Sequence, residues 1–145
     1  MKNSFSNTIL ILGVLFLCIT TVSCQKDKTD TFDITQSKWK LKYISINNTK
    51  ITPLERRWHM YVLEFTNDSF LQLNLSVNSG GGKYQISSLG NITIALDAYT
   101  ELCCDNDFDL QLIGVAKQIT TYKVLGNKLI FKGSDTEIVF KKKFP

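Results

Sequence analysis

The rest of the chain is organised around one stretch, Thr100-Glu101-Leu102-Cys103-Cys104-Asp105-Asn106-Asp107-Phe108-Asp109-Leu110-Gln111-Leu112-Ile113. Within it and just beyond it, Phe108, Leu112 and Val115 recur at steps of four and three. This spacing places them on one face of an amphipathic helix. It is the only good helix candidate in the chain, because the segments on either side alternate apolar and polar residues instead.

The ends of this helix are also marked in the sequence. Asp105 is a plausible N-cap, and Asp107 and Asp109 suit the positive end of the helix dipole. Lys117 suits the C-terminal end. The alternating aspartates resemble a calcium-binding loop, but Phe108 stands in its glycine-turn region and no glutamate occupies its twelfth position. We therefore predict no metal site.

If an N-terminal signal is removed, Cys103 and Cys104 are the only cysteines left besides Cys24 at its boundary. An adjacent pair can close a strained vicinal disulfide, form an intermolecular bond, or leave one thiol buried and the other exposed. The spacing excludes CxxC redox chemistry, so a structural role is favoured. His59 is the only histidine and has no metal-ligand spacing around it, and no catalytic residues or cofactors are predicted.

Alternation of apolar and polar residues predicts short strands along the rest of the chain. About eight such segments occur, at 39–43, 60–65, 69–77, 83–88, 91–97, 120–124, 129–131 and 137–141. No strand–helix–strand repeat is present, so the sheet is expected to be antiparallel. Short, evenly spaced strands favour a closed or nearly closed barrel, with the single helix before the last three strands.

The alternation also assigns faces and turns. Trp39, Leu41 and Tyr43 are expected to share the inward face of the first strand, and Val77 is expected to point inward at the end of the 69–77 segment. Gly80-Gly81-Gly82 is expected to be a loop, because three glycines carry too much backbone freedom for a strand interior. The predicted turns are Asn47-Asn48, Asn67-Asp68, Leu89-Gly90, Leu125-Gly126-Asn127 and Gly133-Ser134-Asp135.

The chain begins with a short positive segment and an uncharged apolar run at 9–19, followed by Val22-Ser23-Cys24. This is the layout of a secretory signal, and the run is shorter than the ~20 residues of a membrane span. The cysteine at the boundary resembles a bacterial lipobox, although Thr21 stands where leucine is usual. The expected organisation is a lipoprotein signal peptide at 1–23, a flexible tether at 24–36 and a barrel domain at 37–145.

Acyl chains such as palmitate on Cys24 would anchor the protein, at about 0.8 kcal/mol per buried methylene. This places it in the bacterial cell envelope, with the outer membrane favoured and the leaflet open. An ordinary secreted protein cut near Ser23 is the alternative. Loss of Lys2 with the signal lowers the formal net charge from +4 to +3. That charge is too small to indicate nucleic-acid binding.

Four pieces of the sequence resemble, in order, the META domain of HslJ-like heat-shock lipoproteins. They are Trp39-Lys40-Leu41, the set Asn78, Gly82 and Tyr84, the segment Thr100 to Cys104, and Tyr122 with Gly126-Asn127 and Leu129. The family often carries a cysteine just before the asparagine, where this chain has Val77. The corresponding long-range disulfide is therefore absent, and the Cys103-Cys104 pair stands alone.

The resemblance implies a lipocalin-like barrel, an envelope location and a stress-related role, and it brings no catalytic residues. We therefore expect a non-enzymatic lipoprotein that acts through an unknown envelope protein partner. The alternative is a carrier of a small apolar ligand inside the barrel. A cavity of ~300 Å³ or more would favour the carrier, if it were lined by the inward stripe of Leu71, Leu73, Leu75, Ile92, Ile94, Leu96 and Phe131.

Overall fold

The computed structural model describes residues 34, 35, 37–54, 60–66, 69–87, 89–100 and 105–144. All of these belong to one compact unit, Phe32–Pro145. The predicted signal segment 1–23, the lipidation site Cys24 and most of the tether lie outside the described residues, as do His59, Cys103 and Cys104.

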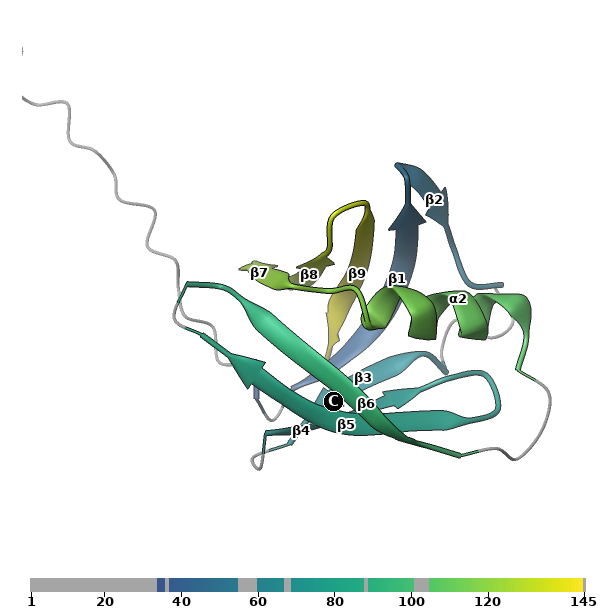
Figure 1. Cartoon of the computed structure of the whole chain (residues 1–145), viewed down its shortest axis with the longest axis horizontal. Coiled ribbons are helices and arrows are strands. Elements are labelled where there is room, and N and C mark those ends of the chain that lie inside the picture. Colours follow the sequence, from purple (N-terminus) through teal and green to yellow (C-terminus); the bar gives the residue numbers. More distant parts are fainter. Residues whose placement is uncertain are drawn as a thin grey trace, which may run out of the picture. The chain divides into compact units, whose positions relative to one another are not determined.

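The described chain is a curled antiparallel sheet with one helix (Figure 1). In chain order the elements are β1 (Lys38–Ile46), β2 (Thr49–Ile51), β3 (Val62–Phe65), β4 (Phe70–Asn74), β5 (Ser79–Ile86), β6 (Ile92–Tyr99), α2 (Asp107–Ala116), β7 (Thr121–Leu125), β8 (Lys128–Lys132) and β9 (Thr136–Lys143). The strand order is β6-β5-β4-β3-β1-β9-β8-β7, with β2 paired to β1. This confirms the predicted fold class and the place of the helix before the last three strands.

The two strands at the ends of this order, β6 and β7, meet along a short seam. Ile92 N donates to Thr120 O at 2.9 Å, and Tyr122 N donates to Gly90 O at 2.8 Å. The sheet therefore curls into a half-barrel whose edges touch at one end. The seam reduces the exposed edge that an open sheet would present.

Residues with positive φ confirm several predicted turns. Asn47 and Asn48 have φ of 49° and 63° between β1 and β2, as a type I′ hairpin turn requires. Gly126 has φ of 57° between β7 and β8, and Gly90 has φ of 78° before β6. The predicted turn at Asn67-Asp68 lies outside the described residues, although β3 and β4 do pair as a hairpin.

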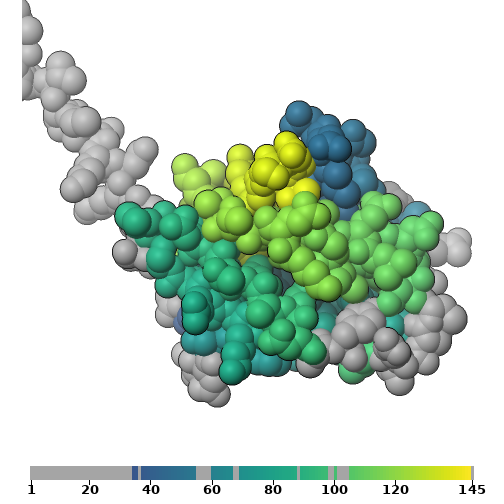
Figure 2. Space-filling view, viewed as in Figure 1, coloured from purple at the N-terminus to yellow at the C-terminus, as the bar shows by residue number. Residues whose placement is uncertain are grey.

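The interior of the half-barrel is filled by aromatic and aliphatic side chains. The largest are Trp39, Tyr61, Phe65, Phe131 and Phe140, each at most 1% exposed. Phe131 meets Phe65 and Phe140 edge to face, with ring centroids 6.4 and 5.8 Å apart. Helix α2 contributes buried Leu112, Val115 and Ala116 and contacts β1 and β9. In the view of Figure 2, atoms of α2 and of β6 lie at the front of the domain.

A register shift in β1 overturns the prediction for Tyr43. The pairing of β1 with β9 slips between Leu41 and Tyr43. The bulge moves the inward position one residue along, so that Ile44 is fully buried and Tyr43 is half-buried on the other face. Tyr43 O–H donates to Glu137 Oε1 at 3.1 Å, and Lys50 Nζ lies 4.2 Å from its ring centroid.

The prediction of a loop at Gly80-Gly81-Gly82 is wrong, because all three residues lie inside β5 and are buried. Here glycine serves close packing between strands. A Cβ on Gly82 would lie 1.7 Å from the carbonyl oxygen of Ala95 on β6, and one on Gly81 would lie 2.9 Å from the Phe70 ring. The pairing of β5 with β6 shifts register between Gly81 and Gly82.

Two further assignments need correction. Val77 is 41% exposed in the turn after β4 and does not continue the inward stripe of Leu71, Leu73 and Leu75. The N-cap of α2 is Asn106 and not Asp105. The Asn106 side chain accepts a hydrogen bond from the backbone N–H of Asp109. Strand β4 ends earlier than the alternating pattern predicts, and α2 begins one residue later than predicted.

Candidate functional site

Polar side chains converge where α2 begins, beside the turn that joins β4 to β5. We call this group the helix-start cluster, and its members are Tyr61, Ser76, Asn78, Asp105, Asn106 and Asp109. Three segments far apart in the chain supply it. It is the most buried polar group among the described residues, and we treat it as the candidate site.

Asp109 is the centre of the helix-start cluster and is 0% exposed. Its Oδ2 accepts a short hydrogen bond from Ser76 Oγ. Its backbone N–H donates to Asn106 Oδ1 at 2.9 Å, which completes the helix cap. Its Oδ1 is buried with no hydrogen-bond partner among the described residues. A carboxylate in this position is costly to bury, so the contact with Ser76 is important for the fold.

Two further hydrogen bonds link the turn after β4 to the segment before α2. Asn106 Nδ2 donates to Ser76 Oγ at 3.0 Å, and Asn78 Nδ2 donates to Asp105 Oδ1 at 2.8 Å. Each joins residues about thirty positions apart in the sequence. Together they hold the first turn of α2 against the end of the β4–β5 hairpin.

Tyr61 completes the cluster from the segment just before β3. Burial raises the pKa of the Tyr61 hydroxyl, and the neighbouring Asp109 carboxylate acts in the same direction. Hydrogen bonding to Asn106 and Ser76 acts in the opposite direction on this pKa. The Tyr61 ring also packs edge to face on Phe108 of α2, with centroids 5.2 Å apart. The phenol is therefore neutral at physiological pH and serves as a packed, polar contact.

The chemistry open to this cluster is narrow. Ser76 donates to a carboxylate, but no imidazole or amine among the described residues stands beside its hydroxyl to act as a base. The described residues also contain no group of three or more metal-ligating side chains. The hydrogen bonds inside the cluster engage most of its polar atoms. The arrangement therefore fastens α2 to the sheet.

A second polar feature lies at the far end of β1. A recess of about 310 Å³ opens between the β1–β2 turn and the β8–β9 turn. Its lining is polar and includes Asn47, Ser134 and Asp135. None of the seven residues of the predicted inward stripe lines it. Five of the seven are 1–4% exposed in the core, and Ile94 and Leu96 are partly buried against it.

The residues singled out by the sequence fall in different places. Asn78 joins the helix-start cluster. Trp39 and Leu41 are fully buried in the core, and Trp39 Nε1 has no hydrogen-bond partner among the described residues. Tyr84 is buried, and its hydroxyl donates to Thr66 O at 3.3 Å.

The remaining motif residues hold strands together or form turns. Thr100 Oγ1 accepts from Ser79 N at 2.9 Å and so fastens the end of β6 to β5. Gly82 allows close approach of β6, and Gly126-Asn127 forms the β7–β8 turn. The Cys103-Cys104 pair directly precedes the described part of the cluster but lies outside the described residues.

The sequence patterns do not identify Ser76 or Asn106 as site residues, nor do they predict the burial of Asp109. One signal was present, because Asp109 shares a helix face with Leu112 and Ala116, which are three and seven positions further on. An aspartate within an apolar helix face must find a buried partner. The identity of that partner depends on the tertiary fold, since Ser76 is 33 residues away.

Comparison with known proteins bears on the fold alone. Neither the protein-family models nor the curated proteins give a match to this sequence. The chain is similar in structure to a DUF4847 family protein from Bacteroides vulgatus, with a TM-score of 0.59 and 11% identity over 75% of this chain and 94% of that one. It is also similar to a protein from Burkholderia xenovorans solved by NMR, with a TM-score of 0.64 and 10% identity over 77% and 85%.

These similarities define the class as a mainly antiparallel half-barrel with one helix. At such low sequence identity, the similarities do not indicate the role of any residue. No helix in the described part of the chain has the length and apolar character needed to cross a membrane.

Proposed function

We propose that this chain is a lipid-anchored protein of the bacterial cell envelope whose META-like domain is non-enzymatic. It would act through contacts with an envelope protein partner, in a stress-related role, with the outer membrane as the favoured location. The anchor is supported by Val22-Ser23-Cys24 after an apolar run. The META assignment is supported by one helix before three closing strands and by the burial of Trp39 and Tyr84.

The observation that carries the non-enzymatic part is the internal pairing of the helix-start cluster. Ser76 and Asn106 direct their donors to other members of the cluster, and Asp109 is 0% exposed. A group that no substrate can reach cannot act on one. Buried polar networks of this kind rigidify a fold and specify its arrangement.

The same core weighs against the carrier alternative. A small apolar ligand would need space along the inward stripe, yet Leu71, Leu73 and Phe131 pack into one continuous core. The recess of about 310 Å³ lies elsewhere and has a polar lining. Filled interiors are usual for small barrels. A binding surface on the outside of the domain is therefore the better proposal.

Metabolic labelling of cells with a clickable fatty acid tests the anchor. The wild-type protein should carry the label and fractionate with membranes, whereas the Cys24→Ser variant should lose both properties. A matched Cys18→Ser variant should keep both, because Cys18 lies in the apolar run that is removed. An unlabelled wild-type protein, or label that survives Cys24→Ser, would refute lipid attachment.

Crosslinking in intact envelopes followed by affinity purification tests the partner. Specific envelope proteins should be captured with the wild-type protein at native abundance. The capture should weaken in the Cys24→Ser variant, because the protein would no longer be held at the membrane. Recovery of the protein only as free monomer, with full labelling at Cys24, would contradict a protein-interaction role.

A further inference from the structure

Charge is segregated between the two halves of the sheet. The contiguous strands β1, β9, β8 and β7 carry nine lysines and one carboxylate, Glu137. The other half, β3 to β6, carries one lysine, Lys83, and two carboxylates, Glu64 and Asp97. One half of the sheet is therefore strongly basic, although the net charge of the whole chain is modest.

The strand register places many of these lysines on one surface. Lys40 lies directly opposite Lys141, and Lys141 lies directly opposite Lys128 on the next strand. Directly opposite residues point to the same side of an antiparallel sheet. We call these three residues the lysine row. The inward residues between them, such as Leu41, Phe140 and Leu129, are fully or almost fully buried, so the row faces outward.

Such a row is electrostatically unfavourable by itself. Like charges directly opposite one another destabilise a sheet, because their Cβ atoms stand only ~5 Å apart. The pKa of the Lys40 amine is lowered, first by burial and then by repulsion from Lys42 and Lys143. Two ion pairs lie on this part of the sheet: Lys38 pairs with Glu64 at 3.0 Å near the row, and Lys132 pairs with Glu137 at 3.5 Å at the opposite end of β8 and β9. An external anion placed against the row would relieve this repulsion.

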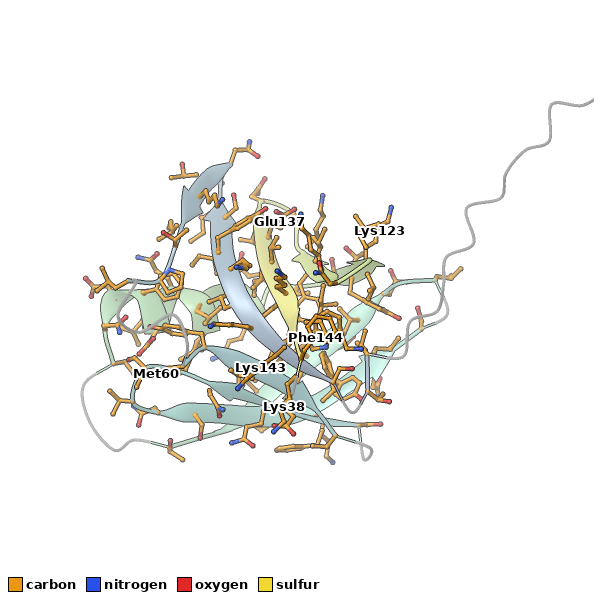
Figure 3. The ribbon with its side chains drawn as sticks, turned by 180° about the vertical axis from the view of Figure 1, so that it is seen from behind. Lys38, Met60, Lys123, Glu137, Lys143 and Phe144 are labelled. Atoms are coloured by element: carbon orange, nitrogen blue, oxygen red, sulfur yellow. The ribbon has the colours of Figure 1, made fainter. Side chains whose placement is uncertain are left out.

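The row lies near the end of the sheet where the chain from Cys24 enters. Lys38 begins β1 and is registered with Lys143 at the end of β9. Phe144 follows and is 66% exposed. Figure 3 shows Lys38, Lys143 and Phe144 gathered at one end of these strands, away from Lys123 and Glu137. Lys38 lies fourteen positions after Cys24, a span of at most about 50 Å when fully extended.

We propose that the outer face of β1, β9 and β8 docks on the anionic phospholipid headgroups of the bilayer that holds Cys24. This inference rests on the lipid attachment proposed above. The lysine row supplies the charge that attracts anionic headgroups, and Phe144 supplies an aromatic side chain at the interface. A lipid and a basic patch act as two anchoring signals on one surface. The opposite half of the sheet would then face away from the bilayer.

The test uses the full lipidated protein in two kinds of vesicle. One is pure phosphatidylcholine, and in the other part of it is replaced by phosphatidylglycerol. Flotation reports lipid attachment in both. Brief labelling of amines, followed by mass spectrometry, reports the exposure of each lysine.

In anionic vesicles, labelling of Lys128, Lys141 and Lys143 should fall several-fold relative to neutral vesicles, and high salt should restore it. Lys50, Lys83 and Lys117, which lie outside the basic half-sheet, should label equally in both. Equal labelling of Lys141 in both vesicle types, with the protein floating in both, would overturn the docking. Failure to float with neutral vesicles while protection on anionic vesicles persists would overturn only the lipid attachment.

Two matched variants sharpen the result. The triple change Lys40→Gln, Lys128→Gln and Lys141→Gln should abolish the protection of Lys143. The control triple change Lys50→Gln, Lys83→Gln and Lys117→Gln removes the same charge and should leave it intact. Both should melt cooperatively, as the wild type does. Persistent Lys143 protection in the first variant, or equal protection by soluble polyphosphate without vesicles, would overturn the membrane assignment.

Discussion

At the residue scale, the stability of the helix start depends on how one carboxylate is held. Asp109 is fully buried, its Oδ2 accepts from Ser76, and its Oδ1 has no partner among the described residues. Removing a donor from a buried acceptor costs the desolvation energy of that acceptor. The Ser76 hydroxyl should therefore matter more than its size suggests.

Ser76→Ala should lower the free energy of unfolding by about 1–3 kcal/mol, because it removes a donor from the buried carboxylate. Asp107→Ala, which removes an exposed carboxylate from the same helix turn, should cost less than about 1 kcal/mol. Urea denaturation of both variants measures the difference. Equal effects would contradict the role given to the Ser76–Asp109 contact.

Tyr61 gives the helix-start cluster a pH dependence at the alkaline end. Its pKa is raised in the folded state, mainly by burial, so the folded protein holds this proton more tightly than the unfolded chain does. The contribution to stability is complete below the unfolded value of ~10 and is lost as pH rises through the raised folded value.

Tyr61→Phe should remove this part of the alkaline loss of stability. The difference in unfolding free energy between wild type and variant should be constant near neutral pH and should move in favour of the variant above pH ~10. Urea denaturation across this range measures it. Tyr43 and Tyr122, whose pKa values are also raised, contribute equally to both proteins and cancel. A difference that does not change with pH would contradict the assignment.

At the element scale, β5 depends on close packing against β6. Gly82→Ala should cost at least about 2 kcal/mol, since the new Cβ would meet the backbone carbonyl of Ala95, which cannot move without disturbing the ladder. Gly114→Ala is the matched control. Nothing lies within 4 Å of its added Cβ in α2, so it should gain about 0.5–1 kcal/mol. Thermal melting of the two variants should show shifts of opposite sign.

The lysine row gives a second prediction at this scale. The pKa of Lys40 is lowered by burial and by repulsion from Lys42 and Lys143, so its charged form is disfavoured in the folded state. Lys40→Gln should therefore raise stability at neutral pH, by less than about 1 kcal/mol. High salt should shrink the gain, because part of it is screened repulsion. A gain that is unaffected by salt would assign the effect to burial alone.

Local patterning explains which elements could be predicted from sequence. Alternation and turn chemistry were sufficient for the hairpins around Asn47-Asn48 and Gly126-Asn127, because both signals are local. The position of Tyr43 was not predictable, since a bulge shifts every later side chain to the other face. The run Gly80-Gly81-Gly82 was misassigned because its purpose, room for Phe70 and Ala95, arises only once β4, β5 and β6 pair.

The candidate site was also predictable only where local sequence signals define it. The sequence identifies Asn78 as a motif residue, but it predicts that the partner of Asn78, Asp105, caps the helix itself. The cluster joins Tyr61, Ser76 and Asp109, whose proximity depends on long-range pairing of the sheet with α2. Sequence periodicity carries no information on such pairings. The polar character of the residues was visible, and their convergence was not.

At the scale of the whole domain, the half-barrel is closed only by the short seam between β6 and β7. The two hydrogen bonds there join Ile92 to Thr120 and Tyr122 to Gly90. By contrast, β1 and β9 are registered over almost their whole length, from Lys38–Lys143 to Ile46–Thr136. The seam should therefore be the weakest junction in the barrel, since few contacts must break for the edges to separate.

Hydrogen exchange measures this difference directly. The amides of Ile92 and Tyr122 should exchange by local opening, at a free energy well below that of global unfolding. The Leu41 amide, which donates to Tyr61 O at 2.9 Å inside the core of the sheet, should exchange only on global unfolding. Denaturant added below the unfolding transition should speed exchange at Leu41 and leave it almost unchanged at the seam, because local opening exposes little surface. If all three amides exchange only with the free energy of global unfolding, the seam opens only when the whole barrel unfolds. The domain then behaves as a fully closed structure.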